Sequence, residues 1–301
     1  MQKKIGMVIV NYNDFENTDH LIKNVEDYKC LNHIVIVDNN SKDDSFEKLK
    51  SLEKDNLTVI KNNSRNYSSG LNTGAKFLIE KLGVCNIIFS NSDISIKQEE
   101  DLINLSETMK EDIVVVGPTI DEHGVINRGW HLPSVNQEIL FNIPYFNRNF
   151  KRKYLLYKDS DYEKETTLVD VVSGCFFVVD SDFLKKVDYF DSSTLLYYEE
   201  QILAEKVKKE NKKECINNKI IIYHNHSVTV DKSIKRLEKQ KILKESQRYY
   251  IKNYKKSNIM QRILLYITDY VYRGFLYIVC LLKSFKWKKY FSKKAKISYV
   301  K

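Results

Sequence analysis

Three groups of polar side chains have the types and spacing needed for acid–base chemistry or for holding a cation. Asp38 and Asp93 each follow a short apolar run. A carboxylate in that place can accept a hydrogen bond from a base or a ribose, or bind a divalent cation through hard oxygen ligands. Glu199 and Glu200 follow two tyrosines, and aromatic flanks favour the burial that a general base needs. His224 ends a further apolar run and can add a nitrogen ligand to a cation.

Each group also has an ordinary structural role, and spacing alone does not separate the two. An Asp after a strand commonly caps a helix or closes an Asx turn. Two adjacent carboxylates commonly mark a solvated helix start, where the helix dipole favours negative charge. The run from Gly70 to Gly74 is neither a dinucleotide-binding loop nor a Walker loop, and we expect it to allow close packing at a helix start.

The elements that must position these groups alternate between strands and helices. Apolar runs predict strands at residues 5–10, 34–38, 57–60 and 86–89, with helical patterns around Leu21 and Leu49. Helices between apolar strands predict parallel pairing with both faces of the sheet covered. Ligands of such sheets collect at the carboxyl ends of the strands, so the loops at 38–41, 62–75 and 90–93 form the expected binding edge.

Composition limits the class of protein. The chain has 301 residues, of which 43% are hydrophobic and 30% charged, so it can bury a large core. Nine Gly and three Pro exclude collagen-like and Pro-rich low-complexity chains. The five cysteines are scattered without a CxxC pair, which indicates reduced thiols. The apolar run near the N-terminus is too short for a signal peptide, and we expect a cytoplasmic protein.

The positive charge is concentrated at the C-terminal end. Residues 251–301 carry 13 Lys and Arg and one acid, so their net charge is +12 against +9 for the whole chain. Residues 263–282 have the length of a membrane span but contain Asp269 and Arg273. The pattern predicts an amphipathic helix that lies on an anionic membrane surface through residues 262–301; a helix packed on the core is the alternative. No nucleic acid partner is expected.

Seven segments occur in the order that bacterial family-2 glycosyltransferases show. They are VIVNYN (8–13), IVDNNSKD (36–43), RNYSSGLNTGA (65–75), FSNSDI (89–94), VVSGCFFV (171–178), FDSSTLLYYEEQIL (190–203) and YHNHS (223–227). The chain resembles this family, and most of all its rhamnosyltransferase-like branch, over about residues 5–253. The resemblance implies a GT-A fold, an α/β architecture with a Rossmann-like, mostly parallel central sheet flanked by helices. Residues 1–250 would form the catalytic domain and residues 251–301 a basic, membrane-associating helical extension.

The resemblance also implies a role for each matched position. Asn11, Tyr12, Asp38 and Arg65 would border the nucleotide of the sugar donor, together with Asn91, which starts the segment that matches the family's Asp-x-Asp motif. Asp93 and His224 would hold a divalent cation, Mn²⁺ or Mg²⁺. Gly174 and Tyr198 would face the acceptor, and the pair Glu199 and Glu200 would supply the catalytic base, with Glu200 in the base position. Asn66 replaces a family Gly, and an Asn tolerates the left-handed backbone that the Gly would supply.

The implied reaction is an inverting transfer of a sugar from a UDP- or dTDP-type donor to a hydroxyl of a glycan acceptor. The acceptor would be lipid-linked, in polysaccharide or O-antigen-type biosynthesis, with the enzyme peripheral on the inner face of the cell membrane. A nucleotidyltransferase is the nearest alternative enzyme, but it needs a Gly-rich basic loop after the first strand, and VIVNYND is not one. A membrane- or RNA-binding scaffold with an inactive pocket is the alternative outside enzymes.

Overall fold

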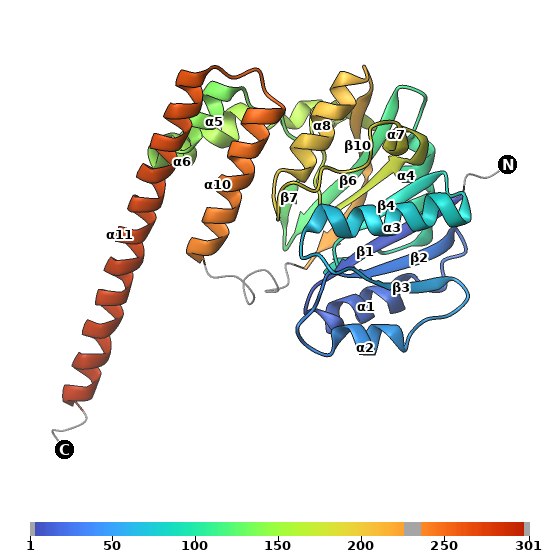
Figure 1. Cartoon of the computed structure of the whole chain (residues 1–301), viewed down its shortest axis with the longest axis horizontal. Helices are drawn as coiled ribbons and strands as arrows, with labels where there is room; N and C mark the ends of the chain where they lie inside the picture. Colours follow the sequence, from blue (N-terminus) through green and yellow to red (C-terminus); the bar gives the residue numbers. More distant parts are fainter. Residues whose placement is uncertain (1–3, 226–235, 298–301) are drawn as a thin grey trace.

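A single sheet forms the centre of the molecule (Figure 1). The computed structural model describes the backbone of residues 4–225 and 236–297 and the side chains of residues 4–225 and 237–278. The strands are β1 Ile5–Asn11, β2 Leu31–Asp38, β3 Leu57–Lys61, β4 Asn86–Ser90, β5 Ile94–Ser95, β6 Ile113–Glu122, β7 Val125–Asn127, β8 Thr166–Val169, β9 Phe176–Asp180 and β10 Lys213–His224. The helices are α1 Phe15–Val25, α2 Ser45–Lys50, α3 Tyr67–Leu82, α4 Glu99–Thr108, α5 Val135–Phe141, α6 Pro144–Leu155, α7 Ser181–Lys186, α8 Glu199–Lys209, α10 Arg236–Asn253 and α11 Ile259–Ile297, with a 3₁₀ turn at Asp159–Tyr162.

The N-terminal half of the sheet has the predicted parallel arrangement. The strand order is β3-β2-β1-β4-β9-β6-β10-β5, and β1 pairs in parallel with both β2 and β4. All four strands that the apolar runs predict are confirmed. Asn11 pairs with Asp38 across β1 and β2, so the carboxyl ends of these strands meet at one edge, as expected.

The other half of the sheet is mixed, which corrects the prediction of a mostly parallel sheet. Strand β9 runs antiparallel to both of its neighbours, β4 and β6. The chain enters β9 at the carboxyl end of β4, where the backbone N–H of Asn91 donates to the carbonyl of Cys175 at 2.9 Å. Because β9 starts where β4 ends, the two strands must run in opposite directions. The sequence around residue 175 contains no signal for this reversal.

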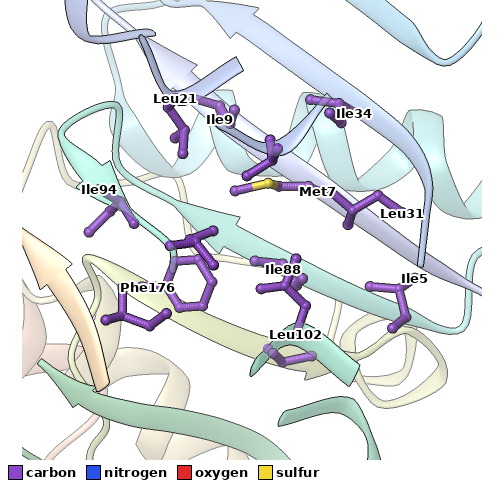
Figure 2. Close-up of a cluster of buried hydrophobic side chains, with 14 of the residues drawn as sticks. Ile5, Met7, Ile9, Leu21, Leu31, Ile34, Ile88, Ile94, Leu102 and Phe176 are labelled. Carbon is purple, nitrogen blue, oxygen red and sulfur yellow. The ribbon is translucent and has the colours of Figure 1, made fainter. Parts of the chain in front are cut away.

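Both faces of the sheet are covered, because successive side chains of a strand point to opposite faces. From β1, Ile5, Met7 and Ile9 pack against α1, α2 and α4, in the cluster that Figure 2 shows. Val8 and Val10 point the other way, into a second cluster with α3, α7 and α8. This double burial explains why β1 reads as a continuous apolar run rather than an alternating one.

The C-terminal helices pack on the rest of the chain through a third cluster. Tyr250 of α10 and Leu265 of α11 join Val135 of α5 and Ile202 of α8 there. Helix α10 runs through residue 250, where the sequence places the boundary between two domains. Helix α11 runs back alongside α10, on its side away from the sheet, and extends beyond the N-terminal end of α10 (Figure 1). No helix in the described part of the chain is long and apolar enough to cross a membrane.

Candidate active site

The predicted donor side lies at the carboxyl ends of β1 and β2. Asn11 and Asp38 are both fully buried, and the Asn11 amide donates to the Asp38 carboxylate at 2.9 Å. The same carboxylate accepts from the backbone N–H of Ser41 at 3.0 Å and from its hydroxyl at 2.5 Å. Asp38 therefore closes the loop after β2, which is the structural role that the sequence left open for it. Its contacts fix the floor of the donor side.

Tyr12 and Arg65, also predicted to border the nucleotide, are in contact with each other. The Arg65 guanidinium lies 4.9 Å from the centroid of the Tyr12 ring. Arg65 is exposed and Tyr12 is half-buried, so the pair presents a flat, cationic surface at the mouth of the loops. Such a surface suits a nucleobase and the charge of a diphosphate, because a planar guanidinium can both stack and donate hydrogen bonds.

The start of α3 differs from expectation at Asn66. Its φ is −72°, so the chain needs no left-handed residue there, and its side chain caps the helix by accepting from the N–H of Ser69. The Asn66 amide also donates to the carbonyls of Ser192, at 2.6 Å, and of Thr194. Asn66 therefore ties the donor side to the loop that precedes α8.

The close packing predicted for the run from Gly70 to Gly74 is confirmed. A Cβ at Gly74 would lie 2.5 Å from Cγ1 of Val8 on β1. A Cβ at Gly70 would lie 2.8 Å from Oδ1 of Asn39, directly after β2. These two glycines let α3 approach the sheet edge that carries the site.

Asp93 and His224 lie together, as the resemblance implies. Oδ1 of Asp93 is 3.2 Å from Nε2 of His224, and both side chains are about one-tenth exposed. The antiparallel pairing of β5 with β10 sets this contact, because it places His224 opposite Ile94, the residue after Asp93. The backbone N–H of Asn225 also donates to the carbonyl of Asp93 at 2.9 Å.

Glu122, at the end of β6, completes this group and was not found from the sequence. Its Oε1 lies 3.2 Å from Nδ1 of His224. Burial lowers the pKa of His224, but contacts with Asp93 and then with Glu122 outweigh it, and the pKa is raised. Glu122 is more than 100 positions from His224 along the chain, and only the parallel pairing of β6 with β10 brings the two together.

The pair formed by Asp93 and His224 fits two neighbouring ligands of one cation. Two ligand atoms at right angles, each about 2.1 Å from a metal, lie about 3 Å apart, close to the observed 3.2 Å. A carboxylate on the other ring nitrogen, the place that Glu122 takes, is the usual partner of a metal-binding His. Among the described residues no cluster of three or more His, Cys, Asp or Glu is arranged for a metal. Donor phosphates and water would complete the coordination.

The two carboxylates at the start of α8 differ in their surroundings. Glu199 is 7% exposed, and its Oε1 has no hydrogen-bond partner among the residues that the structure describes. Glu200 is half-buried and lies directly against Gly174, where a Cβ would stand 2.6 Å from Cγ of Glu200. Tyr197 and Tyr198, just before them, have φ of 75° and 72°. Two consecutive non-glycine residues with positive φ are rare and indicate a constrained turn that aims this pair.

Both carboxylates hold protons more tightly than an ordinary Glu. Burial, and then the charge of Glu200, raise the pKa of Glu199 to about 8. Burial also raises the pKa of Glu200, while the backbone N–H groups of Glu200 and Gly174 act in the opposite direction. A raised pKa near neutrality is what a general base requires, since a base with a very low pKa takes protons poorly.

Comparison with known proteins identifies the family. A profile of glycosyl transferase family 2 matches residues 7–187, which is more than half of the chain. The chain belongs to glycosyl transferase family 2. Among curated proteins no sequence matches significantly.

Solved structures share the fold at low sequence identity. GalNAc-T7 with UDP, GalNAc and Mn²⁺ has a TM-score of 0.56 at 14% identity, over 75% of this chain and 44% of its own, so this chain spans less than half of that protein. The mannosyltransferase PcManGT from Pyrobaculum calidifontis, in complex with GDP-Man and Mn²⁺, has a TM-score of 0.54 at 11% identity, over 90% and 70%. TarS 1-349 of S. aureus has a TM-score of 0.50 at 13% identity, over 90% and 80%. These likenesses support the GT-A architecture.

Tyr67 links the two halves of this family-2 site, although no sequence pattern assigned a role to it. Its hydroxyl donates to Oδ1 of Asn91 at 2.9 Å. Burial raises the pKa of Tyr67, and the charges of Glu199, Glu200 and, more weakly, Asp93 raise it further. Tyr67 therefore keeps its proton and lies within electrostatic range of both the carboxylate pair and the metal pair. The segment RNYSSG contains it, but nothing in that segment points to a bridging contact.

Tyr198 lies among the helices outside the sheet. Its hydroxyl donates to Oε2 of Glu138 at 2.8 Å, and the amide of Gln247 donates to the same oxygen at 2.6 Å. Its ring lies 5.2 Å from that of Tyr250. The acceptor-side role stays a prediction for Tyr198 and for Gly174, which touches Glu200. The contacts of Tyr198 also support the turn before α8.

Proposed function

We propose that this family-2 glycosyltransferase moves a sugar from a nucleotide-diphosphate donor, of the UDP or dTDP type, to a hydroxyl of a glycan acceptor with inversion at the anomeric carbon. The observation that carries the proposal is the arrangement around Tyr67. Its hydroxyl donates to Asn91, two residues before Asp93. Besides burial, the charges of Glu199, Glu200 and, more weakly, Asp93 raise its pKa, so the carboxylate pair and the metal pair lie within electrostatic range of one side chain. A displacement reaction needs both a cation site for the leaving diphosphate and a base for the acceptor hydroxyl within reach of one sugar.

The residues divide the chemistry between them. Glu200 accepts the proton of the acceptor hydroxyl while that oxygen forms a bond to the anomeric carbon. The bond from this carbon to the phosphate oxygen breaks, and its electron pair leaves with the nucleoside diphosphate. A single displacement from the opposite face inverts the configuration. Burial, and then the charge of Glu200, raise the pKa of the neighbouring Glu199.

Asp93 and His224 would hold a divalent cation, which supplies positive charge opposite the leaving diphosphate when it is bound. Two solved relatives of the same fold contain Mn²⁺ together with a nucleotide or a nucleotide sugar. Asn91, Tyr12 and Arg65 line the donor side, and their positions suit a base and a diphosphate. The buried Asp38 and Asn11 support the loop beneath them.

The acceptor is a lipid-linked glycan in the biosynthesis of a bacterial cell-surface polysaccharide, and the enzyme works at the inner face of the membrane. The order of the seven sequence segments supports the rhamnosyltransferase-like branch. The basic C-terminal end, with a net charge of +12, supports contact with an anionic membrane.

A thermal-shift panel of nucleoside diphosphates with and without Mn²⁺ tests the proposal. A ligand at 100 times its Kd stabilises the folded state by about 2.7 kcal/mol, which raises Tm by roughly 4 °C in a chain of this size. We expect a uridine or thymidine diphosphate to act only with Mn²⁺. Stabilisation by nucleoside triphosphates alone would favour the nucleotidyltransferase, and no stabilisation by any nucleotide would favour the scaffold.

Two variants separate the metal-binding role from the base role when the thermal shift and sugar transfer are both measured. Asp93→Asn should lose the Mn²⁺-dependent part of the shift, while Glu200→Gln should keep it and lose transfer, because an amide cannot accept the proton. Asp112→Asn, at the opposite end of β6 from Glu122, is the matched control and should behave like the wild type. Normal turnover in Glu200→Gln, together with its loss in Glu199→Gln, would move the base one residue back.

A further inference from the structure

Helix α11 has two faces of opposite character, and the polar one points inward. Asp269 is fully buried and forms ion pairs with Arg248 of α10 and with Arg273 one turn further along α11. The Arg248 guanidinium also lies over the ring of Tyr266, 5.0 Å from its centroid. The side of α11 that carries Asp269 and Arg273 is therefore the face that packs on α10, and it also carries the buried Leu265 and Leu276. Most other apolar residues of α11 are left outside.

These outward residues form a continuous apolar face between residues 259 and 278. Its members are between 42% and 72% exposed: Ile259, Met260, Ile263, Leu264, Ile267, Tyr270, Val271, Phe275, Tyr277 and Ile278. At about 100° per residue they fall within an arc of roughly 160°. The buried residues Leu265, Asp269 and Leu276 lie on the opposite side of the helix. We call this face the outer face of α11.

Helix α6 adds an aromatic and basic surface. It contains Arg148, Lys151, Arg152 and Lys153 and no acid, and Leu155 is its one buried residue. Its rings form a continuous strip: Tyr145 contacts Phe146 at 5.5 Å, Phe146 contacts Phe150 at 5.8 Å, and Phe150 contacts Tyr154 at 6.3 Å between centroids. Tyr145 is 62% exposed and Tyr154 is 53% exposed.

The outer face of α11 and helix α6 are joined through α5. Helix α5 packs directly on α11, and α6 begins two residues after the buried Asn142. The Asn142 amide donates to the hydroxyl of Thr268 at 3.3 Å. Thr268 lies at the edge of the arc, next to the positions of Leu264 and Phe275. The aromatic helix thus starts where the apolar face ends.

We propose that the outer face of α11 and helix α6 together form a surface that binds an anionic lipid bilayer. This inference rests on the proposed function in one respect, the lipid-linked acceptor that the bilayer would present. Apolar side chains enter the acyl boundary, tyrosines lie at the headgroups, and Lys and Arg meet anionic phosphates. The sequence beyond the outer face continues this charge, with eight lysines and no acid between residues 283 and 301.

The positive charge of α6 favours a bilayer, rather than a second copy of the chain, as the partner of this surface. A symmetric dimer through this surface would set two α6 helices, each with four basic and no acidic residues, close to each other. Like charges in one interface repel, whereas anionic headgroups attract them. The surface is also wider than a single helix face, and contiguous exposed apolar patches of this kind mark membrane or protein contacts.

The same helices hold the catalytic turn, so docking would orient the site. The hydroxyl of Ser246 on α10 donates to the carbonyl of Leu196 at 2.7 Å. The hydroxyls of Tyr249 and Tyr254 both donate to the Asp191 carboxylate, at 2.7 and 2.6 Å. Helix α10 therefore fixes the loop that carries Glu199 and Glu200 relative to α11, and the proposed surface sets the distance of that loop from the bilayer.

Flotation of the full chain with lipid vesicles tests the proposal. We expect binding to vesicles of phosphatidylcholine mixed with phosphatidylglycerol, and much weaker binding to pure phosphatidylcholine or at high salt. Ile263→Glu/Ile267→Glu should lower partitioning at least about tenfold, because two apolar side chains at the centre of the outer face are lost. Lys151→Glu/Lys153→Glu should lower it by roughly fivefold for each basic charge lost, on anionic vesicles only.

Matched controls carry the same changes elsewhere on the surface. Val125→Glu/Ile126→Glu alters two exposed apolar residues of β7, and Lys208→Glu/Lys209→Glu reverses two exposed charges of α8. Both should bind vesicles like the wild type. All variants should keep the thermal shift with nucleotide, which shows that they are folded.

Three results would overturn the proposal: a folded wild type that binds neither vesicle, outer-face variants that bind as the wild type does, or a dimer in light scattering that Ile263→Glu/Ile267→Glu dissociates. Glu200→Gln separates this inference from the proposed function. It should lose transfer and keep vesicle binding. Vesicle binding by a protein that no nucleotide stabilises would leave the surface standing and remove the transferase.

Discussion

Replacing Gly174 by Ala should displace the catalytic carboxylate without touching the donor side. An added Cβ would lie 2.6 Å from Cγ and 2.7 Å from Cδ of Glu200. Oε1 of Glu200 would lie closer still, and ordinary contact begins near 3.4 Å, so the end of this side chain must move by at least about 0.8 Å. A misplacement of about 1 Å can cost 100-fold in rate. We therefore expect kcat to fall by roughly 10- to 100-fold, which is about 1.4–2.7 kcal/mol in the barrier.

The assay measures the release of nucleoside diphosphate from nucleotide sugars that carry the diphosphate identified in the thermal-shift panel. KM for the donor should stay unchanged, because the residues on the donor side are not moved. The cost in stability should be no more than about 1 kcal/mol, since the clash is with the flexible end of a side chain. Gly117→Ala is the matched control. Its Cβ would lie 3.1 Å from Val172 and Ile216, away from Glu200, so it should cost stability and leave kcat unchanged.

A double variant decides whether the clash is the cause. Glu200→Asp shortens the arm by one methylene and withdraws the carboxylate from residue 174. Gly174→Ala/Glu200→Asp should therefore be more active than the product of the two single effects predicts, because the two sites are in contact. Wild-type turnover in Gly174→Ala would refute the reasoning. So would strictly multiplicative effects in the cycle.

Three further predictions concern buried charges. Glu199→Gln should raise Tm over the wild type by a margin that grows as pH rises towards about 8, because a carboxyl whose pKa is raised by folding stabilises the fold at low pH and loses that contribution as pH rises through its folded pKa; a constant margin between pH 5 and 9 would contradict this. Glu122→Gln should weaken Mn²⁺ binding by about 10- to 100-fold in calorimetry, because the partner of His224 loses its charge, and unchanged affinity would remove Glu122 from the site. Asp269→Asn should lower the free energy of unfolding in urea by about 3 kcal/mol, because Arg248 is left largely buried without its charge partner; a loss below 0.5 kcal/mol would show that this pair does not hold α11 on α10.

Local pattern was enough to find the parallel half of the sheet and the start of the catalytic helix. Of the four predicted strands, β1, β2 and β4 are buried on both faces, and this double burial is visible in consecutive residues of one segment. The edge strand β3 alternates between buried and half-buried residues. Polar residues directly after these strands, such as Asn11 and Asp38, reach one edge because parallel strands end together. The direction of β9 was not predictable, since it depends on where the chain returns to the sheet, and no local pattern records that.

The site divides in the same way. The sequence by itself determined which residues have the side chains for acid–base or ligand chemistry. It also predicted that Asp93 and His224 lie together, at the 3.2 Å that separates them, and the base role of Glu200 stays a prediction. Only the tertiary structure brought Glu122 to His224, because strand pairing joins positions that are far apart in the chain. Only the structure showed that Tyr198 supports the catalytic turn from the helix cluster.

Helix α11 shows most clearly what can and cannot be predicted from the sequence of one segment. Its sequence determined two opposite faces, because a helical period fixes which residues share a side. It did not determine which face the protein covers. Which face is covered depended on Arg248, which lies in another helix and pairs with Asp269. The side of α11 that carries Asp269 therefore faces inward, and most apolar residues of α11 stay outside. The periodicity of apolar residues can be read from one segment alone. Burial requires a second segment that packs against the first, and only the folded chain brings the two segments together.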